Sequence, residues 1–410
     1  MAEKKTVRSV AAKSLKNKVA GKSIKGKNIL GEMVNKLSGV EKLAGKSLIE
    51  TKDYSVKELE TMLDLAKVFK QMDFEGKQYD FLPNSLFLAL FFDQSTRTKT
   101  SWAGASTRLG GRPVILEGSS TQVSHGETPI ETGAMMGMNA HAIGIRHDMI
   151  IGEGNKFIRE TKKGIDEYAK HEGWKRHVPF VNLQCDIDHP TQVLADLAQM
   201  REYFKGDLAG KKFVISWAYS PSYAKPLSVP QGLITLLTRF GMDVTLAYPK
   251  GYDLMEGCVK DAQRFAKSSG GKFEITNSMK EAVKGADIVY AKSWGPYEMM
   301  LERVELSKKK DSGEQMKALE KRMLELNAKY IDWEYNSKLE KLTNKAKYMH
   351  CLPADITGRM GKAHGEVSGE VFDKHRMFMY QEANWKPYVI AAAVAGSLVP
   401  DLKKKLMSKI

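Results

Sequence analysis

Residues 85–101 read SLFLALFFDQSTRTKTS, and this stretch decides how the chain folds. Its first eight residues form a continuous apolar run, which is typical of a strand buried on both faces of a parallel sheet. The polar residues that follow predict a loop and then a helix that continues through Leu109. A buried strand that runs into a helix is the repeating unit of α/β proteins with parallel sheets.

The same alternation of strand and helix extends to both sides of this stretch. Residues 55–71 are expected to form a helix, with Ser55 as its N-cap, because their apolar side chains recur at helical spacing. Further strands are expected at residues 112–116, 142–145, 180–183, 212–217, 243–247, 273–276, 288–291 and 348–351, and further helices at 191–204, 231–240 and 312–328. The pattern predicts an α/β fold with two doubly wound parallel-sheet domains.

The chain is predicted to have three parts. A basic arm covers residues 1–47, a first domain residues 48–206, and a second domain residues 207–384. The C-terminal helix, about residues 385–410, is expected to pack back on the first domain. The boundary is set at residues 205–211 (KGDLAGK), because this segment is polar and contains two glycines.

Positive charge is concentrated in the arm. Residues 1–47 contain 12 Lys and Arg against 3 Asp and Glu, so the arm holds +9 of the total net charge of +15. Such an arm is either a solvated segment or one that binds an acidic partner such as a nucleic acid. It contains no aromatic side chain that could stack on bases, and this makes nucleic-acid binding the weaker hypothesis.

The composition also bears on location and on metals. The three cysteines Cys185, Cys258 and Cys351 form no CxxC pair, so neither a disulfide framework nor a zinc site is expected. No segment approaches the roughly 20 apolar residues of a membrane-spanning helix, and the lysine-rich N-terminal segment lacks the apolar region of a secretory signal. These features predict a soluble, cytoplasmic protein that binds no metal.

Three polar motifs follow predicted strands. The hydroxyl and guanidinium groups of residues 95–98 (STRT) open a helix, whose N-terminus attracts phosphate through free N–H groups and the helix dipole. Residues 189–192 (HPTQ) also open a helix, and His189 could donate to a carbonyl oxygen. Residues 350–353 (HCLP) contain a candidate cis peptide at Leu352-Pro353. Taken singly, each motif could also be structural.

In order and spacing, the STRT segment, the strand-end Arg146, the HPTQ segment with the LAD that follows it, and HCLP resemble the signature of the aspartate/ornithine carbamoyltransferase family. The resemblance covers the chain from about Leu48 to its C-terminal residue. It implies transfer of the carbamoyl group from carbamoyl phosphate to a small amino or amide acceptor. It also implies a homotrimer with shared active sites and no required cofactor.

The resemblance assigns roles to individual residues. Three of them, Arg146, His189 and Thr98, would be the catalytic donors to the carbamoyl oxygen, where negative charge develops. Residues expected to bind carbamoyl phosphate are Ser95, Thr96, Arg97, Thr98, Arg146, His189, Gln192 and, from a neighbouring subunit, Gln122. Residues expected to bind the acceptor are Cys351, Leu352, Lys292, Trp294, Tyr297 and Lys386. Alternation along a strand is expected to direct His350 away from Cys351, so no base for a nucleophilic cysteine is evident.

The chain departs from the ornithine enzymes at the acceptor side. Residues 292–297 (KSWGPY) replace their acceptor-binding aspartate and Ser-Met-Gly loop, and Lys386 replaces an arginine. Lys292 would repel the ammonium of a free amino acid, unless it simply points to solvent. The proline-rich loop at residues 220–230 is similar to that of the knotted transcarbamylases, and several segments look most similar to the knotted YgeW-type group. An acceptor other than free ornithine is therefore expected.

Alternatives within and outside this class stay open. Within it, the chain could be an N-acetylornithine or ornithine carbamoyltransferase. A dinucleotide-dependent oxidoreductase would also suit the α/β pattern, but the G-x-G-x-x-G turn that it requires is not present.

Overall fold

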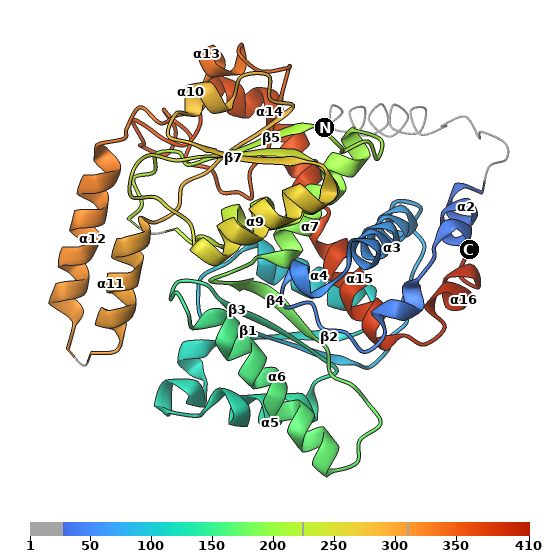
Figure 1. Ribbon diagram of the computed structural model, residues 1–410. Helices are drawn as coiled ribbons and strands as arrows, with labels where there is room; N and C mark the ends of the chain where they lie inside the picture. Colours follow the sequence, from blue (N-terminus) through green and yellow to red (C-terminus); the bar gives the residue numbers. More distant parts are fainter. Residues whose placement is uncertain (1–27, 224, 310) are drawn as a thin grey trace, which may run out of the picture.

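The structure is a computed structural model that describes residues 28–223, 225–309 and 311–410 (Figure 1). It contains two parallel sheets, which lie one above the other in the view of Figure 1. The first 27 residues of the predicted basic arm lie outside the described residues, so the nucleic-acid hypothesis for the arm stays a prediction.

The first sheet has four strands in the order β2–β1–β3–β4, and all of its pairs are parallel. The bounds are β1 Leu86–Phe91, β2 Arg112–Glu117, β3 Ala142–His147 and β4 Phe180–Cys185. β1 lies between two neighbours, and all of its residues except Leu86 are buried. The expectation of a buried strand in a parallel sheet at residues 85–92 is confirmed.

Helices cover both faces of the first sheet (Figure 1). Their bounds are α3 Val56–Phe74, α4 Arg97–Arg108, α5 Pro129–Asn139, α6 Gly154–His171, α7 Pro190–Tyr203 and α15 Lys386–Leu398. α5 and α6 pack on β3 from one side, whereas α4 and α7 pack on β1 and β4 from the other. α15 packs on α3, α4 and α7, so the C-terminal segment returns to the first sheet.

The start of α3 confirms the predicted N-cap. Ser55 Oγ accepts a hydrogen bond from Glu58 N at 3.3 Å, and Glu58 Oε2 accepts one from Ser55 N at 2.8 Å. This capping box satisfies two backbone N–H groups that the first helical turn leaves free.

The second sheet has five parallel strands in the order β7–β6–β5–β8–β9. The strand bounds are β5 Lys212–Ser216, β6 Asp243–Ala247, β7 Lys272–Thr276, β8 Ile288–Ala291 and β9 Lys347–Tyr348. The helix bounds are α8 Ser228–Leu237, α9 Glu256–Ser269, α10 Met279–Ala282, α11 Tyr297–Ser307, α12 Gly313–Ala328, α13 Ser337–Glu340 and α14 Gly369–Ala383. α9 lies on the side of the second sheet that faces the first sheet, and α8 packs on α9 and on α7 (Figure 1). α11 and α12 project together from one side of the molecule (Figure 1).

Two sequence expectations need correction. The strand expected at residues 348–351 is shorter, because beyond Met349 the backbone N–H groups of His350 and Leu352 turn to the side chains of Glu382 and His350. The basic arm was expected to cover residues 1–47, but its described residues, 28–47, pack against the rest of the chain. There α2 (Ile29–Lys36) and a short helix at Val40–Leu43 bury apolar side chains against α3 and against α16 (Leu402–Met407).

No helix in the described ranges combines the length and the apolar character that crossing a bilayer requires.

Candidate functional site

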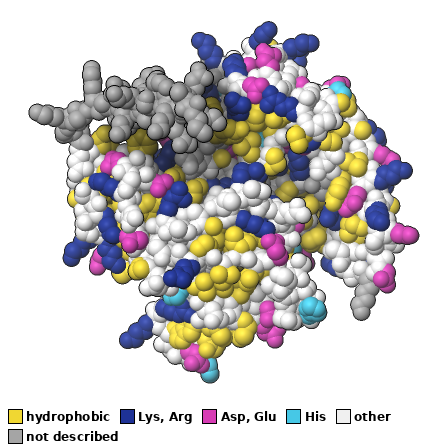
Figure 2. Space-filling view, turned by 180° about the vertical axis from the view of Figure 1, so that it is seen from behind, with side chains coloured by type: hydrophobic (Ala, Val, Ile, Leu, Met, Phe, Trp, Pro, Cys, Tyr) yellow, Lys and Arg dark blue, Asp and Glu magenta, His cyan; other side chains and the backbone are white. Residues whose placement is uncertain are grey.

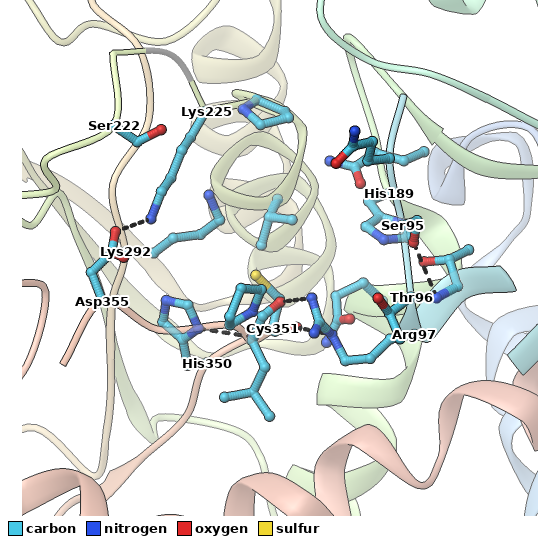
Figure 3. A pocket seen from close by; sticks show the side chains of 18 of the residues that line it. Ser95, Thr96, Arg97, His189, Ser222, Lys225, Lys292, His350, Cys351 and Asp355 are labelled. Atoms are coloured by element: carbon cyan, nitrogen blue, oxygen red, sulfur yellow. Dashed lines mark hydrogen bonds and ion pairs between the residues drawn. The ribbon is translucent and has the colours of Figure 1, made fainter. Parts of the chain in front are cut away.

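A cavity of about 660 Å³ lies between the two sheets. The carboxyl ends of parallel strands from both sheets meet there, which is where open α/β sheets bind ligands. Figure 3 shows Ser95, Thr96, Arg97 and His189 on one side of the cavity and Lys225, Lys292 and Asp355 on the other, with Cys351 between them. From the first sheet and its helices, the lining includes Ser95, Thr96, Arg97, Thr98, Arg146, His189 and Gln192.

The STRT segment forms the N-terminus of α4. Thr96 is the N-cap residue, and no acidic side chain lies in the first turn of this helix. Ser95 Oγ accepts a hydrogen bond from Thr98 N at 3.2 Å. The end of a 12-residue helix with free N–H groups and an adjacent arginine therefore faces the cavity, and this arrangement suits a phosphate group.

Arg97 also links the two sheets. Its Nε donates to the carbonyl oxygen of Cys351 at 3.1 Å, and its Nη2 donates to the carbonyl oxygen of Leu352. Burial lowers the pKa of the guanidinium, but an arginine stays protonated in proteins. A residue expected to bind carbamoyl phosphate is thus in direct contact with two residues expected to bind the acceptor.

Arg146 follows the buried part of β3 and is held by Asp148. Its Nη2 lies 2.9 Å from Asp148 Oδ2, and its Nε is buried with no acceptor among the described residues. Burial raises the pKa of Asp148 well above its ordinary value, while Arg146 opposes that shift. The carboxyl positions the guanidinium and leaves N–H groups available to a ligand.

His189 is the N-cap residue of α7 and is buried. Burial lowers its pKa well below the ordinary value, and the positive charges of Lys386, Arg146, Arg97 and Lys292 lower it further. At pH 7 the imidazole is therefore neutral and has one N–H to donate. A neutral donor beside several cations suits a carbonyl oxygen on which negative charge develops.

The second sheet contributes a network of alternating charges that sequence reasoning missed. Lys225 Nζ lies 2.7 Å from Asp355 Oδ2 and 3.0 Å from Glu366 Oε1, and Lys362 pairs with the other oxygen of Asp355. Burial alone would lower the pKa of Lys225, but the two carboxylates outweigh it and raise the pKa. Lys225 lies in the proline-rich loop at residues 220–230, and Asp355 lies two residues after the HCLP segment, whereas no local motif marks Glu366.

The two carboxylates of this network are already occupied by protein groups. Glu366 accepts hydrogen bonds from Ser293 N at 2.7 Å, from Asp355 N at 2.7 Å and from Lys225 Nζ. Burial alone would raise the pKa of Glu366, but Lys225 and His350 hold it well below its ordinary value. Neither Glu366 nor Asp355 is free to receive a further cation.

Of Lys225, Lys292 and Lys362, the lysines that line the cavity from this side, Lys292 forms no ion pair with a described carboxylate. Its Nζ donates to the carbonyl oxygen of Ser293 at 2.7 Å, and the side chain is only 5% exposed. Burial lowers its pKa. The alternative that Lys292 points to solvent is therefore wrong.

Not all predicted acceptor residues reach the cavity. Cys351, Leu352, Lys292 and Lys386 line it. Trp294 does not, because its indole Nε1 donates to the carbonyl oxygen of Tyr252 and the ring is buried in the core. Tyr297 begins α11 and is half-buried outside the lining.

Two further residues, Gln122 and His350, differ in whether they line the cavity of their own chain. Gln122 lies in a short helix, Gln122–His125, with no buried residue, and it does not line the cavity of its own chain. His350 was expected to point away from Cys351, but both line the cavity because β9 ends before them. His350 Nδ1 accepts from Leu352 N at 2.8 Å, and Nε2 lies 3.3 Å from Glu366 Oε2.

Among the described residues, no cluster of three or more His, Cys, Asp or Glu side chains has the arrangement of a metal site.

Two family models match this chain. Residues 46–202 match the family model "Aspartate/ornithine carbamoyltransferase, carbamoyl-P binding domain", and residues 227–395 match "Aspartate/ornithine carbamoyltransferase, Asp/Orn binding domain". The chain is 46% identical to "Putative carbamoyltransferase YgeW" of Escherichia coli (strain K12), covering 89% of this chain and 94% of that protein. It is 29% identical to N-acetylornithine carbamoyltransferase of Xanthomonas campestris pv. campestris, covering 87% and 99%.

A solved structure of acetylornithine transcarbamylase complexed with acetylcitrulline is also similar. It superposes with a TM-score of 0.70 at 26% identity, over 87% of this chain and 99% of that one.

Proposed function

The chain belongs to the aspartate/ornithine carbamoyltransferase family and is a carbamoyltransferase, and we propose that its acceptor carries a carboxylate or an acylated nitrogen rather than the free ammonium of ornithine. Carbamoyl phosphate would bind with its phosphate at residues 95–98 and its carbamoyl group near Arg146, His189 and Gln192. The acceptor would enter from the side of Lys292.

The observation that carries this proposal is the charge balance of the acceptor half. Lys225, Lys292 and Lys362 face Asp355 and Glu366, three positive groups against two negative ones. Protein donors use both Asp355 and Glu366, so neither carboxylate is left for an ammonium, whereas Lys292 is free to attract an anionic group.

The same arrangement supports a mechanism by positioning and electrostatics. The acceptor nitrogen would attack the carbamoyl carbon, and Arg146, His189 and Thr98 would donate to the oxygen that gains charge. The C–O bond to phosphate then breaks, and the phosphate leaves with Arg97 and the N-terminus of α4 around it. The departing phosphate is a base and can take the proton that the nitrogen loses. No covalent enzyme intermediate is needed.

The proposal extends to domains and assembly. Residues 48–206 with the C-terminal helix would bind carbamoyl phosphate, and residues 207–384 the acceptor. A homotrimer, in which Gln122 completes a neighbour's site, is supported by the exposed position of that residue and by exposed apolar side chains on β2 and α5, Val114 and Met135 among them. Figure 2 shows hydrophobic side chains gathered on the half of the molecule that contains the first sheet.

Two finer features also belong to this proposal. A trefoil knot at residues 220–230 is supported by the resemblance of the proline-rich loop to that of knotted transcarbamylases. A cytoplasmic location is supported by three cysteines that are all free.

The direct test is a screen of amino and amide acceptors with carbamoyl phosphate, scored by phosphate release and by mass spectrometry of the carbamoylated product. The expected substrates carry a carboxylate and no free α-ammonium. Ornithine as the best acceptor would contradict the proposal, and N-acetylornithine as the best acceptor would make the chain an N-acetylornithine carbamoyltransferase.

A further inference from the structure

Two buried carboxyl groups lie in contact beneath the cavity. Asp196 belongs to α7 and Glu382 to α14, and neither side chain is exposed to solvent. α7 packs on the first sheet, whereas α14 packs on β9 of the second. The pair therefore joins the two halves of the molecule directly behind the site.

Gln192 connects this pair to the cavity. Its Nε2 donates to Asp196 Oδ1 at 2.7 Å and to Glu382 Oε1 at 3.3 Å. With the amide nitrogen engaged in this way, the carbonyl Oε1 is the atom of Gln192 that remains for a ligand. The backbone N of His350, in the HCLP segment, contacts Glu382 Oε2 at 3.4 Å.

One oxygen of this carboxyl pair lacks a hydrogen-bond partner in the described part of the chain. Asp196 Oδ2 is buried and has no donor among the described residues. Two carboxylates in contact do not both ionise in a buried site, because like charges repel and burial disfavours each charge. A proton on Glu382 would supply the donor that Asp196 Oδ2 lacks.

The surroundings favour the charge on Asp196 and the proton on Glu382. Burial raises the pKa of Asp196 to about 6, while Glu382, Gln192, Lys386 of α15 and Tyr290 of β8 oppose the rise. Burial and the neighbouring Asp196 raise the pKa of Glu382 well above its ordinary value, and the backbone N–H of His350 opposes this shift. At pH 7 the pair holds one negative charge and one proton.

We propose that Asp196 and Glu382 act as a positioning pair, sharing one proton and fixing Gln192 with its Oε1 towards the cavity, so that the site selects ligands with a carbamoyl NH₂ group. This inference rests on the proposed role of Gln192 at the carbamoyl end. Inorganic phosphate lacks the NH₂ group and contacts only the STRT end. The ratio of the two affinities therefore reports the orientation of Gln192.

The test is calorimetric titration of carbamoyl phosphate and of inorganic phosphate into the full chain and its variants. Asp196→Asn and Glu382→Ala should each weaken carbamoyl phosphate by about tenfold and phosphate by less than about twofold, because one hydrogen bond at a charged group is lost. Glu382→Gln keeps a donor towards Asp196 and should stay within about threefold of the unmutated affinity. Glu340→Gln, a partly buried carboxylate outside the cavity lining, is the matched control.

A second measurement needs no variant. The affinity of the unmutated protein for carbamoyl phosphate should fall several-fold between pH 7 and about pH 5.5, as Asp196 takes up a proton. A flat profile over this range would overturn the inference, even if the variants do not fold.

The other outcomes are equally decisive. Parallel losses for both ligands would show that the pair only supports the fold, and no loss for either would show that it does not position Gln192. If the unmutated protein does not bind carbamoyl phosphate, the proposed role of Gln192 itself fails. The unmutated protein could bind carbamoyl phosphate while Asp196→Asn leaves the ratio of the affinities for carbamoyl phosphate and inorganic phosphate unchanged. That result would overturn the role of the positioning pair but not the proposed role of Gln192.

Discussion

Replacing Lys292 tests the acceptor assignment most sharply. The Lys292 ammonium is buried, donates to the Ser293 carbonyl oxygen and forms no ion pair with a described carboxylate. An acceptor ammonium about 4 Å from it would be repelled by roughly 4 kcal/mol at an effective dielectric constant of about 20. That energy corresponds to a loss of about three orders of magnitude in affinity. Free ornithine should therefore be a very poor substrate of the unmutated enzyme.

We expect kcat/KM for ornithine to change in steps with the charge at position 292. Lys292→Met keeps the length of the side chain but removes the charge, so kcat/KM for ornithine should rise while that for anionic acceptors falls. Lys292→Asp should shift the preference further towards ornithine, because the repulsion becomes an attraction. Lys374→Met makes the same chemical change on an exposed lysine of α14 and should alter neither value.

The assay is steady-state formation of citrulline from ornithine and of acetylcitrulline from N-acetylornithine, with thermal unfolding as a check of the fold. Efficient citrulline formation by the unmutated enzyme would refute the reasoning. So would equal ornithine rates for the unmutated chain, Lys292→Met and Lys292→Asp.

Three further predictions follow from the site. Arg97→Ala should weaken carbamoyl phosphate by about 1.5–3 kcal/mol, the usual range for a hydrogen bond to a charged group, and unchanged affinity in calorimetry would contradict its role. If the sites are shared in a trimer, mixing inactive Arg97→Ala and Gln122→Ala chains should restore some activity, and hybrids without any would indicate self-contained sites. Burial lowers the pKa of Lys386 from 10.5 to about 8, so the folded chain binds fewer protons than the unfolded chain between these values and its stability rises with pH there. Lys386→Met should remove that rise, which is about 3 kcal/mol in total and about 2 kcal/mol between pH 8 and pH 10, and denaturant unfolding at these two pH values measures the difference.

Sequence alone determined the fold class and the motifs of the carbamoyl phosphate side. Apolar runs such as residues 86–91 and the helical spacing of residues 55–71 are local patterns, and local patterns specify strands and helices. In a parallel sheet the carboxyl ends of the strands share one edge, so polar motifs after successive strands are brought together by the topology. STRT, Arg146 and HPTQ accordingly line one cavity.

Only the tertiary structure decided which charges of the acceptor side are free. Lys225 and Asp355 are 130 residues apart in the chain, and no local pattern shows that their side chains pair. The burial of Trp294, the contact between Asp196 and Glu382, and the isolation of Lys292 also depend on contacts between distant segments. The energy of a charge depends on its burial and its nearest partners, and both are properties of the packed chain rather than of its order of residues.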